Sequence, residues 1–173
     1  MSLRLTQPHR TGQELAAFAA CYCNEPPTSE VVQTRRSAAE HADVLQIIAV
    51  DGDERAKLTH VITALLAAGA AASDIAIVSL AGQTQTQYAN LKQLCGKLVV
   101  RADQDANAAI VCDTFLRYKG LERPFVILAE LPVGQTSSYA QRMHIALTRA
   151  TARAIVLVPE AAARYDARLA PTT

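Results

Sequence analysis

The chain has 173 residues, of which 50% are hydrophobic and 19% are charged, a composition typical of one globular domain with a sizeable core. Its 17 basic and 16 acidic residues give a net charge of +1, without the basic excess expected of a domain that grips nucleic acid alone. No apolar run reaches the roughly 18 residues of a membrane span, and the N-terminus has no apolar signal core. We therefore expect a cytoplasmic protein that has no membrane partner.

The first predicted element is a helix over residues 11–24. Thr11 and Glu14 have the spacing of a capping box, and Pro26 and Pro27 end the helix. Its apolar face is expected to consist of Leu15, Phe18, Ala19 and Tyr22. Residues 28–43 are polar and mixed, which predicts a loop with room for a helical turn.

From residue 44 onward, apolar runs of strand length alternate with helical segments. Strands are predicted at residues 44–50, 75–80, 97–101, 108–114, 125–131 and 154–158. Helices are predicted at residues 53–68, 84–95, 138–150 and 160–169, with Gly69 and Gly96 closing the first two. The strands are apolar throughout, which is typical of burial on both faces, and helices between them favour a mostly parallel sheet. The sequence therefore predicts a three-layer α/β domain.

In such sheets, ligands bind beyond the carboxyl ends of the strands. The places to look are the loops after Thr114 and Leu131 and the start of the 138–150 helix.

The four cysteines, Cys21, Cys23, Cys95 and Cys112, lack the paired spacing of a zinc site and are expected to be buried, reduced thiols. Residues 1–173 are expected to form one domain. Residues 1–3, Met-Ser-Leu, are similar to a cloning remnant, so we expect this domain to be a piece of a longer protein.

A polar turn, Lys119-Gly120-Leu121-Glu122, precedes the predicted strand at 125–131. Gly120 permits a positive φ or a close approach of the backbone to a ligand. Lys119 can bind phosphate, and Glu122 can accept a hydrogen bond from a sugar hydroxyl. The same residues also suit a charged surface turn with a Lys–Glu pair.

Two arginines are candidates for phosphate binding. Arg149 lies near the end of the predicted 138–150 helix, where a packed helix would hold its guanidinium fork in place. It also suits a helix C-terminus, where the dipole favours a cation. Arg10 directly precedes a predicted helix N-terminus, which attracts anions, but it also fits an ordinary flanking position.

These patches together resemble motifs of superfamily 1 helicases of the UvrD/Rep kind. T-x-x-x-x-K-G-L-E at residues 114–122 resembles motif V, and A-L-T-R-A at 146–150 resembles motif VI. Residues 7–11, Q-P-H-R-T, are similar to motif IV, and S-D-I-A-I-V at 73–78 resembles a strand of the same family. The resemblance spans about residues 5–158 and implies a RecA-like C-terminal domain, called 2A, of a DNA helicase.

The resemblance also implies residue roles. Arg149 and Arg10 would reach the γ-phosphate of ATP held by a neighbouring domain. Glu122 would bind the ribose, with Gly120 and Lys119 in the turn beside it.

Thr114 matches the motif V threonine near the bound single strand, and Arg117 and Tyr118 are further candidates for contacting single-stranded DNA. Leu116 stands where the family has a histidine, and Ala81 and Gly82 stand where it often has arginine and asparagine.

The chain has no G-x-x-x-x-G-K-[ST] phosphate loop, and no predicted strand ends in an acidic pair for Mg²⁺. The expectation is half of an ATP site: ATP and Mg²⁺ bind only together with an N-terminal P-loop domain, 1A, of the same full-length protein. This chain alone should not hydrolyse ATP. The alternative is a non-catalytic RecA-like interaction or regulatory module, which Leu116 and the near-neutral charge favour.

Overall fold

The computed structural model describes residues 9–23, 44–88, 90–132 and 138–169, with side chains of the first segment described from Leu15 onward. Its centre is a seven-stranded sheet in the order β1-β7-β6-β2-β5-β4-β3. The strands are β1 (Leu45–Val50), β2 (Ile75–Ser79), β3 (Gln93–Leu94), β4 (Lys97–Val100), β5 (Ile110–Thr114), β6 (Arg123–Ala129) and β7 (Ala150–Pro159). All neighbouring strands pair in parallel except β3 and β4, which pair antiparallel.

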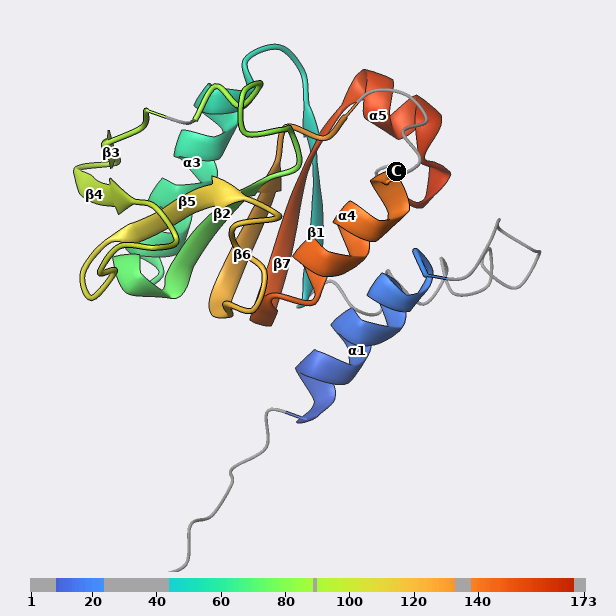
Figure 1. The fold of residues 1–173 in the computed structure, drawn as a ribbon, viewed down its shortest axis with the longest axis horizontal. Coiled ribbons are helices and arrows are strands. Elements are labelled where there is room, and N and C mark those ends of the chain that lie inside the picture. Colours follow the sequence, from blue (N-terminus) through green and yellow to red (C-terminus); the bar gives the residue numbers. More distant parts are fainter. Residues whose placement is uncertain (1–8, 24–43, 89, 133–137, 170–173) are drawn as a thin grey trace, which may run out of the picture.

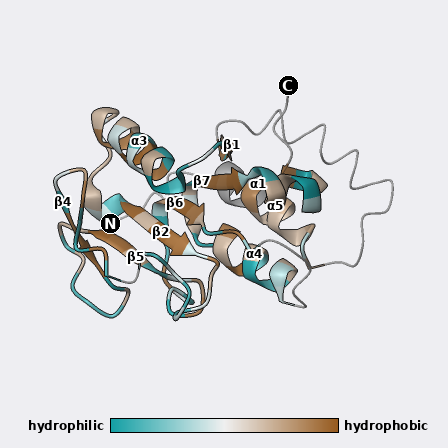
Figure 2. Cartoon of the chain, turned by 90° about the horizontal axis from the view of Figure 1, so that it is seen from above, coloured by the Kyte–Doolittle hydropathy of each residue, from teal (hydrophilic) through white to brown (hydrophobic). Residues whose placement is uncertain are grey.

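Helices cover both faces of this sheet, as Figures 1 and 2 show. Helix α3 (Glu54–Ala67) lies on one face, where Ile77 and Ile127 join its apolar side chains in one core. The other face carries α1 (His9–Ala20), α4 (Tyr139–Leu147) and α5 (Glu160–Tyr165), and there Val78 and Leu128 belong to a second core. The structure therefore confirms an α/β fold with a mostly parallel sheet flanked by helices.

The structure confirms both predicted ends of helix α3, and a local residue accounts for each of them. Asp53 caps α3 by accepting a hydrogen bond from the Arg55 N–H at 2.9 Å. Gly69 follows the helix with a φ of 96°, as expected of a closing glycine. In α1 the backbone is helical from His9 to Ala20, so the helix begins before Thr11 and the prediction that Thr11 is its N-cap is wrong. The side chains of Thr11 and Glu14, and residues 24–43, lie outside the described residues.

The predicted helix at residues 84–95 is wrong. Residues 83–88 form turns instead, because Glu130 accepts hydrogen bonds from the Thr86 hydroxyl at 2.5 Å and from the Gln87 N–H at 2.8 Å. A side chain that captures these donors competes with the helical hydrogen-bond ladder. Cys95 and Gly96 both have positive φ, 50° and 70°, and form the two-residue turn of the β3–β4 hairpin. Gly96 is thus a hairpin residue rather than the end of a helix.

The predicted helix at 160–169 is interrupted. It consists of α5 and a short 3₁₀ helix (Ala167–Leu169), separated by Asp166 in an extended conformation. The buried Asp166 carboxylate accepts hydrogen bonds from the hydroxyls of Tyr22 at 2.8 Å and Tyr139 at 3.0 Å, and pairs with Arg168 at 2.7 Å. This carboxylate therefore bonds the C-terminal segment to the end of α1 and to α4. Asp166 adopts an extended conformation to make these bonds, and the helix is interrupted there.

The expectation of buried thiols holds only for Cys112. All four cysteines are free, but Cys21 and Cys95 are half-buried and Cys23 is exposed. In the described part of the chain, no helix is long and apolar enough to span a membrane.

Replacing Asp166 with alanine should lower the free energy of unfolding by about 3 kcal/mol, because Arg168 and two buried hydroxyls would lose their partner. Urea denaturation of the purified domain measures this. The matched control is Glu160→Ala, which removes an exposed pair with Arg164 and should cost less than about 0.5 kcal/mol. Equal effects of the two substitutions would contradict a structural role for Asp166.

Candidate functional site

The predicted site residues lie at both edges of the sheet. Thr114 ends β5 at the carboxyl edge, whereas the turn at 119–122 precedes β6 at the amino edge, because the loop between these strands runs back along the sheet (Figure 1). Arg149 also lies at the amino edge, immediately before β7. We expected ligands beyond the carboxyl ends of the strands, but the residues predicted to bind nucleotide gather at the opposite edge. We call Tyr118, Lys119, Gly120, Glu122, Arg123 and Arg149 the amino-edge patch.

A backbone hydrogen bond joins the two sequence motifs within this patch. The Arg123 N–H donates to the Arg149 carbonyl at 3.1 Å, and Arg123 stands opposite Ala150 in the β6–β7 pairing. Glu122 and Arg149 each precede one of these paired residues, so β6–β7 pairing places them side by side.

The Arg149 side chain is half-buried and partly engaged with its own helix. Its Nε donates to the Ile145 carbonyl at 3.1 Å, and one terminal nitrogen donates to the Thr148 hydroxyl at 3.0 Å. These bonds agree with the alternative role of satisfying a helix end. Within the described residues, however, no carboxylate lies within ion-pair distance of Arg149, so its charge is not neutralised by a neighbouring acid.

The other members of the patch differ in exposure. Lys119 and Glu122 are exposed, and Gly120 has a φ of 89°, a left-handed conformation that favours glycine. Tyr118 is fully buried, and burial raises the pKa of its hydroxyl to about 12 despite the nearby charges of Arg123 and Arg149. Its ring therefore has no exposed face on which a base could stack, contrary to the expectation that it contacts single-stranded DNA.

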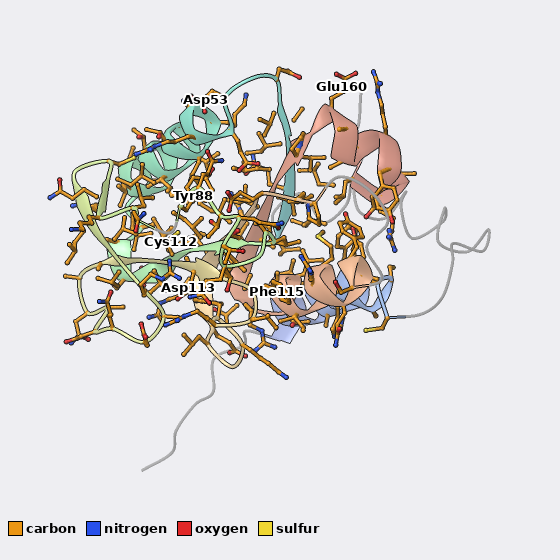
Figure 3. All side chains as sticks on the ribbon, turned by 45° about the horizontal axis from the view of Figure 1, so that its top comes forward. Asp53, Tyr88, Cys112, Asp113, Phe115 and Glu160 are labelled. Atoms are coloured by element: carbon orange, nitrogen blue, oxygen red, sulfur yellow. The ribbon has the colours of Figure 1, made fainter. Side chains whose placement is uncertain are left out.

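At the carboxyl edge, the buried Asp113 organises the residues around β5 (Figure 3). Its carboxylate pairs with Arg101 at 2.9 Å and Arg117 at 3.2 Å, and accepts from the backbone N–H groups of Ala102 and Thr114. Thr114 is buried beside it.

Arg117, predicted to contact nucleic acid, is exposed but also pairs with Asp103 at 2.6 Å. The Arg117 guanidinium is therefore already paired with the carboxylates of Asp103 and Asp113, which would compete with a phosphate for it.

Arg142 links three elements at the same edge. Its guanidinium lies over the Phe115 ring, 5.0 Å from the centroid, and donates to the Leu80 carbonyl at 2.9 Å. Its Nε donates to the Ser138 hydroxyl at 3.0 Å. Arg142 thus fixes the start of α4 against the segments that follow β2 and β5.

The sequence prediction missed a pair of carboxylates at the ends of β1 and β6. Glu130 has a φ of 54°, rare for a residue other than glycine, and its carboxylate accepts from the Ser79 hydroxyl as well as from Thr86 and Gln87. Glu54 accepts from the Glu130 N–H at 3.1 Å and from the Tyr88 hydroxyl at 2.9 Å. The only signal in the sequence was Glu130 itself, a single acid within the apolar run at 125–131 that was predicted to be a strand.

No group of three or more His, Cys, Asp or Glu side chains in the described residues could hold a metal ion. The backbone of Arg10 lies in the first turn of α1, and its side chain is outside the described residues.

Comparison with models of known protein families gives no match, and no curated protein matches the chain either. The resemblance to superfamily 1 helicases therefore rests on the residues of this chain alone.

The Glu54–Glu130 pair predicts a pH dependence of stability. Burial, together with the charge of Glu130, raises the pKa of Glu54 from its ordinary value of 4.5, although hydrogen bonds from Tyr88 and the Glu130 N–H oppose the shift. A raised folded-state pKa contributes stability that is fully present below pH 4.5 and is lost as pH rises through the folded value. The free energy of unfolding of the wild type should therefore fall, relative to that of Glu54→Gln, as pH rises from 4.5 toward neutrality. Urea denaturation across this range measures the difference, and parallel pH profiles would contradict the assignment.

Proposed function

We propose that this chain is the second RecA-like motor domain of a superfamily 1 ATP-dependent DNA helicase or translocase. It would complete an ATP site together with a P-loop domain, 1A, of the same full-length protein. The observation that carries the proposal is the hydrogen bond between the Arg123 N–H and the Arg149 carbonyl. It brings the K-G-L-E turn and the end of A-L-T-R-A, which are far apart in sequence, to one edge of the sheet.

The chemistry of the amino-edge patch fits a nucleotide contributed by another domain. Arg149 has a guanidinium that is not ion-paired within the described residues, and Glu122, next to Arg149's hydrogen-bond partner Arg123, has an exposed carboxylate. A guanidinium can neutralise the charge that develops on phosphate oxygens during phosphoryl transfer, and a carboxylate can accept from ribose hydroxyls. Lys119 and Gly120 would shape the turn that approaches the nucleotide. ATP and Mg²⁺ would be held mainly by the P-loop domain, with Mg²⁺ offsetting charge on the phosphates.

Arg10 is proposed as a second arginine of this site, contributed by α1. The helix packs against α4 and β7, and it begins on the amino-edge side of the sheet (Figure 1). This is the side on which Arg149 lies.

Single-stranded DNA would be contacted at the carboxyl edge, around Thr114 and Arg117. Binding would be mainly to the phosphate backbone and would weaken with salt. Since Arg117 is held by Asp103 and Asp113, a phosphate would have to replace at least the exposed Asp103.

A non-catalytic interaction or regulatory module is the second candidate. Three observations favour it: the doubly paired Arg117, the buried Tyr118 ring, and the exposed Leu116 in place of a polar coupling residue. Arg149 distinguishes the candidates, since only the motor needs its charge.

In the full-length protein that contains the P-loop domain, Arg149→Ala should lower kcat for ATP hydrolysis by about 10³-fold or more, because charge on the transferring phosphate loses a guanidinium. Steady-state ATPase assays measure this, with Arg164→Ala, an exposed site at the far edge, as the control expected to keep activity. Unchanged ATPase in Arg149→Ala would support the regulatory module instead. The 173-residue chain alone should show no Mg²⁺-dependent turnover.

Asp103→Asn should raise the affinity of the domain for a fluorescent oligo-dT strand about threefold or more, because Arg117 would lose one competing carboxylate. Fluorescence anisotropy at low salt measures the affinity. Asp105→Asn makes the same change of net charge two residues away, where the side chain bonds Asn107 rather than Arg117. If both variants gain affinity equally, general electrostatics and not Arg117 would be responsible.

A further inference from the structure

Among the arginines of the described residues, Arg101, Arg117, Arg164 and Arg168 are ion-paired with carboxylates. Arg123 and Arg149, like Arg55 and Arg142, have no carboxylate within ion-pair distance among the described residues. Both lie in the amino-edge patch, next to each other across the β6–β7 pairing.

Two buried polar atoms in the same patch have no hydrogen-bond partner. They are the Tyr118 hydroxyl and the Nε of Arg123, neither of which has a partner among the described residues. Buried polar groups in folded proteins almost always have partners, so an exception calls for an explanation. Arg123 Nε can only donate, and the Tyr118 hydroxyl can also donate, so an oxyanion is the kind of partner that would serve both.

The backbone around Arg123 explains why its guanidinium stays near this turn. The β6–β7 register shifts between Arg123 and Phe125, around Pro124, which has no N–H for the ladder. A terminal nitrogen of Arg123 donates to the Glu122 carbonyl at 3.0 Å, which folds the side chain back over the K-G-L-E turn.

Access to these donors is through the turn itself. The position where a Cβ of Gly120 would project has no atom within 4 Å, and the neighbouring Lys119 and Glu122 are exposed. An anion can therefore approach the backbone at Gly120, in the same turn as Tyr118 and next to Arg123.

We propose that Arg123, Arg149 and the Tyr118 hydroxyl form one binding site for a polyphosphate chain. Arg123 supplies a second guanidinium beside Arg149, and Tyr118 anchors the anion from the buried side. Identifying the anion as the phosphate chain of a nucleotide rests on the proposed function, whereas the oxyanion site itself does not.

The test uses the 173-residue chain and sodium tripolyphosphate at about 0.15 M salt, where non-specific surface attraction is largely screened. The arginine Nε–H signals, followed by NMR in the wild type, report the site directly. We expect saturable shifts of the Arg123 and Arg149 signals with a dissociation constant on the order of millimolar. Absence of saturable shifts at Arg123 would overturn the proposal.

Variants separate specific binding from general charge. Arg123→Gln should weaken binding about tenfold, and Arg123→Lys should restore only part of it, because a lysine has no planar fork. Arg164→Gln makes the same charge change at the opposite edge and should leave binding unchanged. Equal losses in Arg123→Gln and Arg164→Gln would overturn the site.

Tyr118→Phe tests the buried anchor. The variant removes an unpartnered hydroxyl, so the domain should remain folded with unchanged or higher thermal stability, while tripolyphosphate binding weakens severalfold. Unchanged affinity would remove Tyr118 from the site.

The outcomes for the two proposals are separable. Tripolyphosphate binding that depends on Arg123, together with unaffected ATPase in Arg149→Ala, would retain the oxyanion site and reject the motor function. The reverse pattern would retain the motor function and reject the oxyanion site.

Discussion

Burial of the central strands on both faces is the constraint on which the rest of this structure depends. Ile77 and Val78 are adjacent in β2, point to opposite cores, and are both fully buried. Parallel neighbours cannot be joined by a tight turn, so each connection must cross the sheet, and the crossing segments supply the cover for its faces. Polar side chains that could bind a ligand are thereby confined to the two edges of the sheet, where the strands begin and end.

The two edges differ in how their charged residues are arranged. Acidic residues follow the strands β1, β6 and β7 at the carboxyl edge, namely Asp51, Asp53, Glu54, Glu130 and Glu160, and Figure 3 shows Asp53 and Glu160 there. At the amino edge, Arg123 and Arg149 have no acidic partner in the described residues. The carboxyl edge also carries basic groups, among them Arg101, Arg117 and Arg142.

Helix α4 connects these edges physically. Arg142 holds its first turn against Leu80 and Phe115, whereas Arg149, just beyond its last turn, belongs to the amino-edge patch. The His144 Nδ1 lies 2.9 Å from the Ala19 carbonyl, which can only accept, so this bond ties the middle of the helix to α1. Helix α4 is thus anchored near Phe115 at its start and lies next to Arg149 at its end.

The sequence alone was sufficient for every strand except β3, for the mostly parallel sheet and for three of the helices, because two-sided burial and Asp53 or Gly69 at helix ends leave local patterns. It failed at residues 84–95, because Glu130, which is distant in sequence, accepts a backbone hydrogen bond there that a helix would need. It also failed at Gly96, which has the sequence pattern of a glycine that ends a helix. Pairing of Leu94 with Lys97 makes Gly96 part of a hairpin turn instead. The sequence also singled out Glu122 and Arg149 as candidates. Only the tertiary structure decided that they lie together, that Tyr118 is buried and that Arg123 joins them, because β6–β7 pairing and burial are contacts between residues far apart along the chain.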